Sequence, residues 1–184
     1  MQEVKGSVLK SRFAMIEEAG GADAVKRVLA AMTPEDRDTL KTVVAVGWYP
    51  FELGKRLDDA IVKSVGGGRA EFFEKLGESS AVQNLTGSHK SFLAPGDPHR
   101  FLGRAHAIYG AYYKTGHREY EQAGEKEGVL TTFDAEAYSA PDCLTVVGWH
   151  KKALEMCGCT GVKVVEEECR ARGGAVCRYR VSWT

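Results

Sequence analysis

The hydrophobic period of the sequence changes near residue 117, and this change decides the fold class. Before it, apolar residues recur every three or four positions, beginning with Leu9, Phe13 and Ile16, and Gly20-Gly21 interrupts the series. Such spacing predicts a run of amphipathic helices. Thr33-Pro34 gives the clearest start signal, because it joins a capping hydroxyl to a proline at the first helical position.

The second part of the chain has the pattern of strands. Residues 118–124 and 128–134 predict one pair, and residues 162–170 and 175–183 predict a closing hairpin. A helix opened by Pro141 separates the two pairs. Strands joined by short turns pair in antiparallel fashion, so the sequence predicts an α+β fold. In this fold a helical N-terminal half packs on an antiparallel sheet, and the C-terminal half has the order β-β-α-β-β.

The middle of the chain contains three further signals for where helices start or stop. Asp97-Pro98 predicts the start of one helix that ends at Gly116. Trp48-Tyr49-Pro50 interrupts the helical pattern, because the residue before a proline avoids the helical region. We also expect the helix that contains Phe72 and Phe73 to break near Gly77.

The composition is that of a soluble protein. Apolar residues make up 43% and charged residues 27% of a chain of 184 residues, so we expect a single domain over residues 1–184. The net charge of zero argues against a nucleic-acid partner. No apolar run approaches the about 18 residues of a membrane span, and the N-terminus lacks the apolar core of a secretory signal. The sequence therefore predicts a cytoplasmic protein.

Three cysteines and a glutamate form the strongest chemical signal. If residues 172–174 make a three-residue loop, Cys169 faces Cys177 across the hairpin, with β-carbons roughly 4.5–5.5 Å apart. Cys143 lies in the first turn of the last helix, where the positive helix end favours a thiolate. With Glu166, three sulfurs and one oxygen complete a tetrahedron that suits zinc.

The spacing alone leaves other readings of these residues open. In a regular strand Glu166 and Cys169 point to opposite faces, so both reach one ion only where the chain bulges or turns. Free cysteines are often small buried hydrophobes, and opposed cysteines can form a disulfide. An odd count of five cysteines in a reducing compartment disfavours a disulfide framework.

Residues 141–183 resemble the end of the 4-vinyl reductase-like domain. The likeness rests on Pro141-Asp142-Cys143, on VVGWHKKAL at residues 146–154 and on EEECRARGGAVCRYRVSW at residues 166–183. That domain belongs to a superfamily that includes the heme-based nitric oxide sensors and the TRAPP vesicle-tethering subunits. In aromatic-sensing domains of bacterial activators with this fold, the same Cys…Glu-x₂-Cys-x₇-Cys series binds a structural zinc beside a small-molecule pocket. The resemblance implies a structural zinc, and a local bend in the strand, at Cys143, Glu166, Cys169 and Cys177.

The whole chain also resembles a myxobacterial paralogous family of proteins of similar length. VKGSVLKSRF at residues 4–13, GGADAVKRVLAAM at residues 20–32 and WYP at residues 48–50 carry this likeness. It bears on the fold more than on the activity. The sequence contains none of the heme-sensor motifs in full, so we do not expect heme.

Three aromatic residues are candidates for a ligand pocket. His106 and Tyr109 lie on the helix that ends at Gly116, and Trp48 precedes the break at Pro50. They could line a site for a small apolar or aromatic ligand, although each could equally be an ordinary core or surface residue.

These observations predict a non-enzymatic small-molecule-binding or sensory regulatory domain. We expect it to form a homodimer and to pass its signal to a protein partner. The alternative is a protein–protein interaction scaffold of the TRAPP type without an exchangeable ligand. An apolar cavity of roughly 300 Å³ or more would favour ligand binding, and a filled interior would favour the scaffold. No catalytic motif is visible, so vinyl-reductase activity is the least favoured reading.

Overall fold

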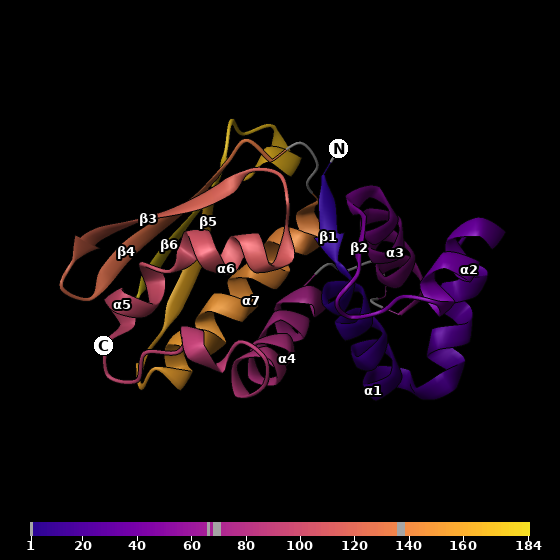
Figure 1. Cartoon of the computed structure of the whole chain (residues 1–184), viewed down its shortest axis with the longest axis horizontal. Helices are drawn as coiled ribbons and strands as arrows, with labels where there is room; N and C mark the ends of the chain where they lie inside the picture. Colours follow the sequence, from indigo (N-terminus) through magenta and orange to yellow (C-terminus); the bar gives the residue numbers. More distant parts are fainter. Residues whose placement is uncertain (1, 66, 68–70, 136–138) are drawn as a thin grey trace.

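The fold joins a helical N-terminal layer to a C-terminal antiparallel sheet, with further helices between them (Figure 1). The computed structural model describes residues 2–65, 67, 71–135 and 139–184. The arrangement confirms the α+β class predicted from the change of hydrophobic period.

The N-terminal layer packs around its own apolar core, to which Leu9, Ile16 and Leu57 contribute fully buried side chains. Its longest helix bends sharply at Gly20 and Gly21, where the sequence predicted an interruption; Gly21 has a φ of 64°. The interruption predicted at Trp48-Tyr49-Pro50 is a short strand that pairs with the start of the chain. The layer consists of β1 (Glu3–Lys5), α1 (Gly6–Ala30), α2 (Pro34–Lys41), β2 (Trp48–Pro50) and α3 (Phe51–Ser64).

Helices α4 (Phe72–Thr86) and α7 (Ala140–Met156) cross with their backbones in contact. A β-carbon on Gly77 would lie 2.1 Å from the carbonyl oxygen of Thr145, and one on Gly148 would lie 1.8 Å from that of Glu74. The predicted break at Gly77 is therefore wrong. The helix continues through this residue, because the missing side chain serves the close approach of α7.

The helix predicted from Asp97-Pro98 to Gly116 is two helices. Asp97 caps the first by accepting the Arg100 N–H at 2.9 Å, as the sequence suggested. Arg104 leaves the helical region, and its guanidinium donates to the Phe92 carbonyl at 2.8 Å in the 3₁₀ turn of residues 90–92. This side-chain anchor accompanies the break between α5 (Pro98–Leu102) and α6 (Ala105–Tyr112).

The C-terminal sheet has the strand order β3-β4-β6-β5, with every neighbouring pair antiparallel. Buried and partly exposed residues alternate along β4 and β6, so one face of the sheet is covered. The predicted order β-β-α-β-β is confirmed. The strands are β3 (His117–Gly124), β4 (Glu127–Phe133), β5 (Lys163–Glu168) and β6 (Cys177–Ser182).

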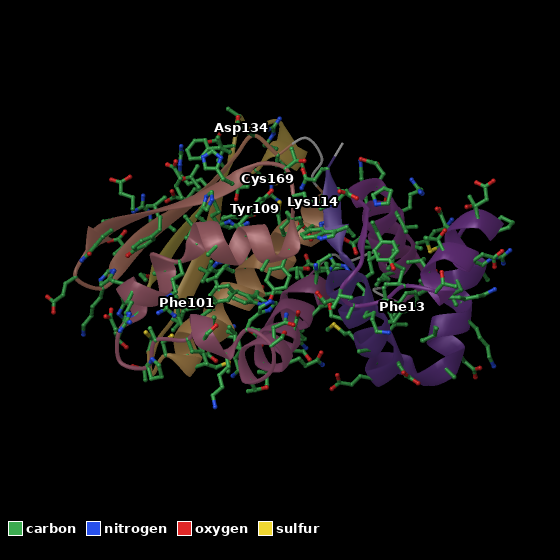
Figure 2. All side chains as sticks on the ribbon, viewed as in Figure 1. Phe13, Phe101, Tyr109, Lys114, Asp134 and Cys169 are labelled. Carbon is green, nitrogen blue, oxygen red and sulfur yellow. The ribbon has the colours of Figure 1, made fainter. Side chains whose placement is uncertain are left out.

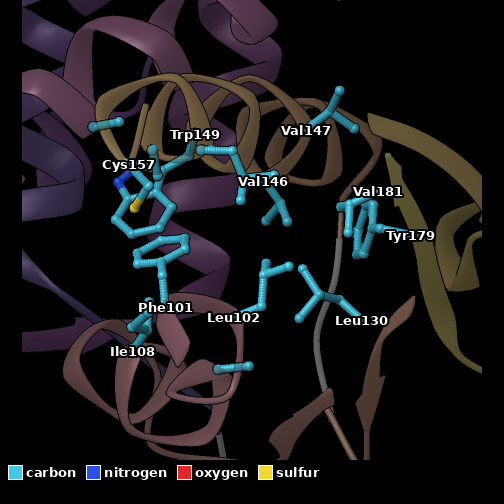
Figure 3. Packing of buried hydrophobic residues seen from close by; sticks show 14 of the residues in the cluster. Phe101, Leu102, Ile108, Leu130, Val146, Val147, Trp149, Cys157, Tyr179 and Val181 are labelled. Atoms are coloured by element: carbon cyan, nitrogen blue, oxygen red, sulfur yellow. The ribbon is translucent and has the colours of Figure 1, made fainter. Parts of the chain in front are cut away.

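The covered face packs against α5, α6 and α7 in a second apolar core. Figure 3 shows Phe101 beneath Trp149, with Leu130 and Tyr179 contributed by the sheet. The Phe101 and Trp149 rings are stacked with centroids 6.1 Å apart. This packing places α7 at the centre of the molecule, where it contacts both the helical layer and the sheet.

Within the described residues, no helix has the length and apolar character needed to cross a bilayer.

Candidate functional site

A cavity of about 50 Å³ lies between α1, α4, α6, α7 and the beginning of β3. Aromatic side chains, among them Tyr109, Tyr112 and Trp149, form much of its wall. Arg118 and His150 add polar groups. The helical layer, the central helices and the sheet therefore all meet at this one space.

His150 presents a free lone pair within this region. The side chain is 2% exposed, and its Nδ1–H donates to the Val146 carbonyl at 2.9 Å, which leaves Nε2 as an acceptor without a partner among the described residues. Burial, helped by the positive charge of Arg118, lowers the pKa of His150 to about 3. The imidazole is therefore neutral at physiological pH, and Nε2 is available to accept a hydrogen bond.

Trp149 is the complementary group. Its Nε1–H is buried and has no acceptor among the described residues, although the ring packs against Phe101 and Tyr112. Buried polar atoms without partners are rare in folded proteins. Two consecutive residues of α7 that line this cavity thus carry one unused buried donor and one unused buried acceptor.

Arg118 is a buried cation with unusual surroundings. It is 5% exposed, its Nε–H donates to Thr132 Oγ1 at 2.9 Å, and its guanidinium carbon lies 5.4 and 5.6 Å from the ring centroids of Tyr109 and Tyr179. Within the described part of the chain it forms no ion pair with an acid. It also borders a second cavity of about 30 Å³, which reaches Cys143 and Cys177. The sequence analysis missed this residue.

A buried ionic network closes the opposite side of the cavity. Arg12 of α1 binds Asp58 of α3 in bidentate fashion at 2.7 and 3.1 Å, and also binds Asp142 of α7 at 3.0 Å. The Tyr113 hydroxyl donates to Asp142 at 2.9 Å. Because Asp142 precedes Cys143, this network joins the helical layer to the first turn of α7.

The structure brings the four predicted metal-ligating residues together. The Sγ atom of Cys143 lies 3.6 Å from that of Cys169 and 3.8 Å from that of Cys177. One donor atom from each of these cysteines and from Glu166 lies within 4.8 Å of the other three. Glu166 Oε1 is buried without a partner among the described residues. We call these four residues the thiol cluster. Figure 2 labels Cys169 in this part of the molecule and Tyr109 on α6.

The hairpin assembles the thiol cluster differently from the sequence prediction. The predicted three-residue loop is wrong, because β5 ends at Glu168 and a 3₁₀ turn follows at Arg170–Arg172. The left-handed position belongs to Gly173, with a φ of 90°. Cys169 therefore lies beyond the ladder rather than opposite Cys177. A register shift between Glu166 and Glu168 supplies the bend that lets Glu166 and Cys169 converge.

The three thiols of the thiol cluster differ in the direction of their pKa shifts. Hydrogen bonds to the neighbouring sulfurs, with burial, raise the pKa of Cys143. The hydrogen bond with Cys143 lowers the pKa of Cys169. A second hydrogen bond with Cys143 lowers the pKa of Cys177 to about 6. Arg172 forms an ion pair with Glu166. Negative charge therefore gathers on Cys169, Cys177 and Glu166, and the two thiolates are the donor type that a thiophilic cation prefers.

The three predicted ligand-binding residues lie in different places. Tyr109 lines the 50 Å³ cavity and donates its hydroxyl to the Thr115 carbonyl at 2.7 Å. His106 is exposed, with its ring 6.1 Å from that of His117. Trp48 lies beneath the ammonium groups of Lys5 and Lys114, at 4.3 and 5.0 Å. Of the three, only Tyr109 is part of the cavity wall.

Residues 53–184 match the sequence family described as protein of unknown function (DUF2378). The chain belongs to this family. None of the curated proteins compared with this DUF2378 chain matches it by sequence.

Solved structures of H-NOX proteins share its fold. The unliganded Fe(II) H-NOX protein from K. algicida is 12% identical with a TM-score of 0.76, and the match covers 98% of this chain and 96% of that one. The S. oneidensis H-NOX protein in the Fe(II)NO state is 13% identical with a TM-score of 0.72, covering 98% and 99%. A third structure, from a study of heme distortion in the H-NOX family, is 12% identical with a TM-score of 0.74, covering 98% and 95%. At these identities the likeness shows the fold, and it supports the part of the predicted resemblance that concerns the nitric oxide sensors.

These comparisons correct the cofactor prediction. The sequence led us to expect structural zinc, whereas the titles of the H-NOX structures name Fe(II) and heme. Zinc is therefore withdrawn as the cofactor of the DUF2378 chain.

Heme does not fit the cavity at α7. Pockets for ligands of that size enclose roughly 300–1,000 Å³, and the side chains here leave about 50 Å³. His150 Nε2 has an unused lone pair of the kind that binds iron, but the space lined by Tyr109, Tyr112 and Trp149 is too small for a macrocycle.

Proposed function

We propose that this DUF2378 chain is a non-enzymatic sensory domain that binds a small molecule in the cavity at α7. The observation that carries the proposal is the pair of unpartnered ring nitrogens, Trp149 Nε1 and His150 Nε2. A buried polar group left without a partner costs about 1–3 kcal/mol, so an occupant that satisfies both nitrogens binds with a matching advantage. The H-NOX fold agrees with this role, since one of its members is described in a nitric oxide-bound state.

The cavity volume sets the size of the ligand. An occupied water position requires roughly 10–15 Å³, so about 50 Å³ accommodates only a few heavy atoms. The small aromatic ligand expected from the sequence needs several times this volume. The ligand that we propose is therefore smaller than expected and is recognised by hydrogen bonds.

The indole N–H of Trp149 provides a direct test. Its proton resonance is followed while neutral and charged compounds of two to five heavy atoms are added to the folded protein. We expect at least one compound to shift this resonance in a saturable manner. Val146→Phe should abolish the shift, because the larger side chain fills the cavity. Failure of every compound to move it, with ordered water found at both nitrogens, would refute the proposal.

A scaffold role is the second candidate function, and the size of the cavity favours it. A volume of about 50 Å³ is well below the roughly 300 Å³ that would mark a site for a larger ligand. The exposed side chains of Val44 and Val46, at 55% and 78%, offer apolar surface beside α2. The scaffold function is the correct one if no small compound binds and a protein partner slows the hydrogen exchange of the backbone amides of these valines.

For the thiol cluster we propose that a metal cation fixes the hairpin to α7. The support is the convergence of four donor atoms within 4.8 Å, together with the unpartnered Glu166 Oε1. Elemental analysis of freshly purified protein tests the proposal and identifies the element. We expect about one thiophilic metal ion per chain, a marked loss in Cys169→Ser, and no loss in the control Cys159→Ser. Metal-free, fully folded wild-type protein would contradict it.

We further propose that the chain acts in the cytoplasm as a homodimer that signals through a protein partner, as the resemblance implies. Native mass spectrometry at micromolar concentration tests whether the homodimer forms. A monomer at every concentration examined would exclude the homodimer.

A further inference from the structure

A groove of about 280 Å³ opens on the N-terminal layer and shares no lining residue with the cavity at α7. The bend of α1 shapes it, because Phe13 lines the groove from the arm before the bend, and Val25 and Leu29 line it from the arm after the bend. Leu40 and Val43, at the end of α2 and just beyond it, complete the apolar wall. Figure 2 labels Phe13 in this layer. We call this space the α1–α2 groove.

The wall of the α1–α2 groove is apolar and is only partly covered by protein. Phe13, Val25 and Leu29 are partly buried against the core of the N-terminal layer, and they line the groove with apolar surface. A contiguous apolar surface that is open to solvent marks a binding site far more often than a single exposed apolar residue does. The wall therefore suits an occupant with an apolar chain.

Two lysines give the α1–α2 groove a positive border. Lys10 and Lys41 line it, and none of the described lining residues is acidic. Lys10 is exposed and has no hydrogen bond or ion pair among the described residues. Lys41 pairs with Asp38 at 3.0 Å, but both side chains are largely exposed. Exposed pairs of this kind contribute little stability, so Lys41 is able to turn to another acceptor. The border therefore suits a negative head group.

The size of the α1–α2 groove selects a single flexible chain. A water position requires roughly 10–15 Å³, so about 280 Å³ holds roughly 20 small groups. Seven of the described residues line the groove, whereas a protein partner contacts roughly 20–30 residues on each side of an ordinary interface. An alkyl chain of roughly ten to fourteen carbons fits this space better than a folded protein surface does.

We propose that the α1–α2 groove binds a single-chain amphiphile with an anionic head, the class represented by free medium-chain fatty acids. The alkyl chain packs on Phe13, Val25 and Leu29. Lys10 and Lys41 bind the carboxylate at the border. Because this site is separate from the cavity at α7, the inference goes beyond the proposed function and does not depend on it.

The test follows the methyl resonances of Val25, Leu29 and Val43 while sodium dodecanoate is added to the folded chain below its critical micelle concentration. We expect saturable shifts of these resonances. Along the series octanoate, decanoate and dodecanoate, each added methylene should lower the Kd about two- to fourfold, because each buries further apolar surface.

The role of the charge is tested with two amphiphiles of the same chain length. Dodecanol is neutral and the dodecyltrimethylammonium ion is positive, so both should bind more weakly than dodecanoate, and the cation most weakly. The double substitution Lys10→Met and Lys41→Met should raise the Kd of dodecanoate about fivefold or more and leave that of dodecanol unchanged. Both positions are exposed, so the variant should fold. Lys26→Met, an exposed position outside the groove, is the matched control and should have no effect.

The other possible occupants give different results. Equal affinity for dodecanoate and the cationic amphiphile would overturn the role of the lysines. If dodecanoate leaves the methyl resonances unchanged, the proposal is wrong. Shifts caused only by phosphatidylglycerol vesicles would then assign the face to a membrane surface, and shifts caused only by raising the protein concentration would assign it to a second copy of the chain. The Trp149 indole resonance reports on the cavity at α7 and should not respond to dodecanoate, so each proposal can fail without the other.

Discussion

The neutral, buried imidazole of His150 makes a quantitative prediction about pH. The pKa of His150 is about 3 in the folded protein and 6.5 in an ordinary aqueous setting. Because the folded value is lowered, the unfolded chain binds the proton first as the pH falls. His150 therefore contributes stability that is fully present above pH 6.5 and is lost progressively as the pH approaches 3.

The magnitude follows from the two pKa values. Each pH unit between them costs about 1.4 kcal/mol, less near the ends of the window. Between pH 7.5 and 5.0 the imidazole should therefore remove about 2 kcal/mol from the free energy of unfolding. A loss of this size is a large share of the about 5–15 kcal/mol that stabilises a typical domain.

The perturbation is His150→Gln, which cannot take up the proton but keeps an N–H for the Val146 carbonyl. Urea unfolding of wild type and variant is measured at pH 7.5 and 5.0, followed by far-UV circular dichroism. The wild type should lose about 2 kcal/mol more than His150→Gln over this interval. Any constant cost of the substitution cancels, because only the pH dependence is compared.

Exposed His106→Gln is the matched control and should lose as much as the wild type. Equal losses in wild type and His150→Gln would refute the argument, because they would mean that water or a proton reaches Nε2 in the folded state.

Two further substitutions test the packing and the ionic network. Gly148→Ala should destabilise the protein by about 1–3 kcal/mol, because its β-carbon meets the Glu74 carbonyl, whereas Gly110→Ala, with no atom within 4 Å of the new β-carbon, should be neutral or stabilising in the same urea measurement. Equal effects at the two glycines would contradict the close approach of α4 and α7. Arg12→Met should cost about 3–5 kcal/mol by leaving the buried Asp58 and the partly buried Asp142 carboxylates without their cation. Lys26→Met, which removes an exposed ion pair, should change stability by less than about 1 kcal/mol. A small effect at Arg12 would mean that the buried Asp58 is protonated, in keeping with the pKa of this carboxyl, which burial raises to about 6.

The sequence predicted the parts of the fold that follow from local chemistry. The capped starts at Thr33 and Asp97 and the order of strands and helices after residue 117 depend on neighbouring residues, so a single chain reveals them. Gly77 was misread because a glycine that breaks a helix and one that admits a second backbone look alike without the partner helix.

The candidate site divides in the same way. The four members of the thiol cluster were found through their chemistry and a family resemblance, but the loop that brings Cys169 inward depends on a bulge that spacing does not reveal. Arg118 could have been found from the predicted strands. It pairs with Thr132, which itself pairs with Cys177, so these three residues lie side by side on the sheet. The cavity left none. It arises from five separate segments, and its walls at Trp149 and His150 resemble ordinary core residues of α7.

The glycine contacts between α4 and α7 also determine which parts of this molecule can respond to a ligand. Two backbones in direct contact cannot slide past each other without a collision, so these helices behave as one rigid body. They carry Trp149 and His150 as a fixed wall. Any expansion of the cavity must then be taken up by α1, by α6 or by the start of β3, and a shift of α1 would alter the outer surface of the N-terminal layer.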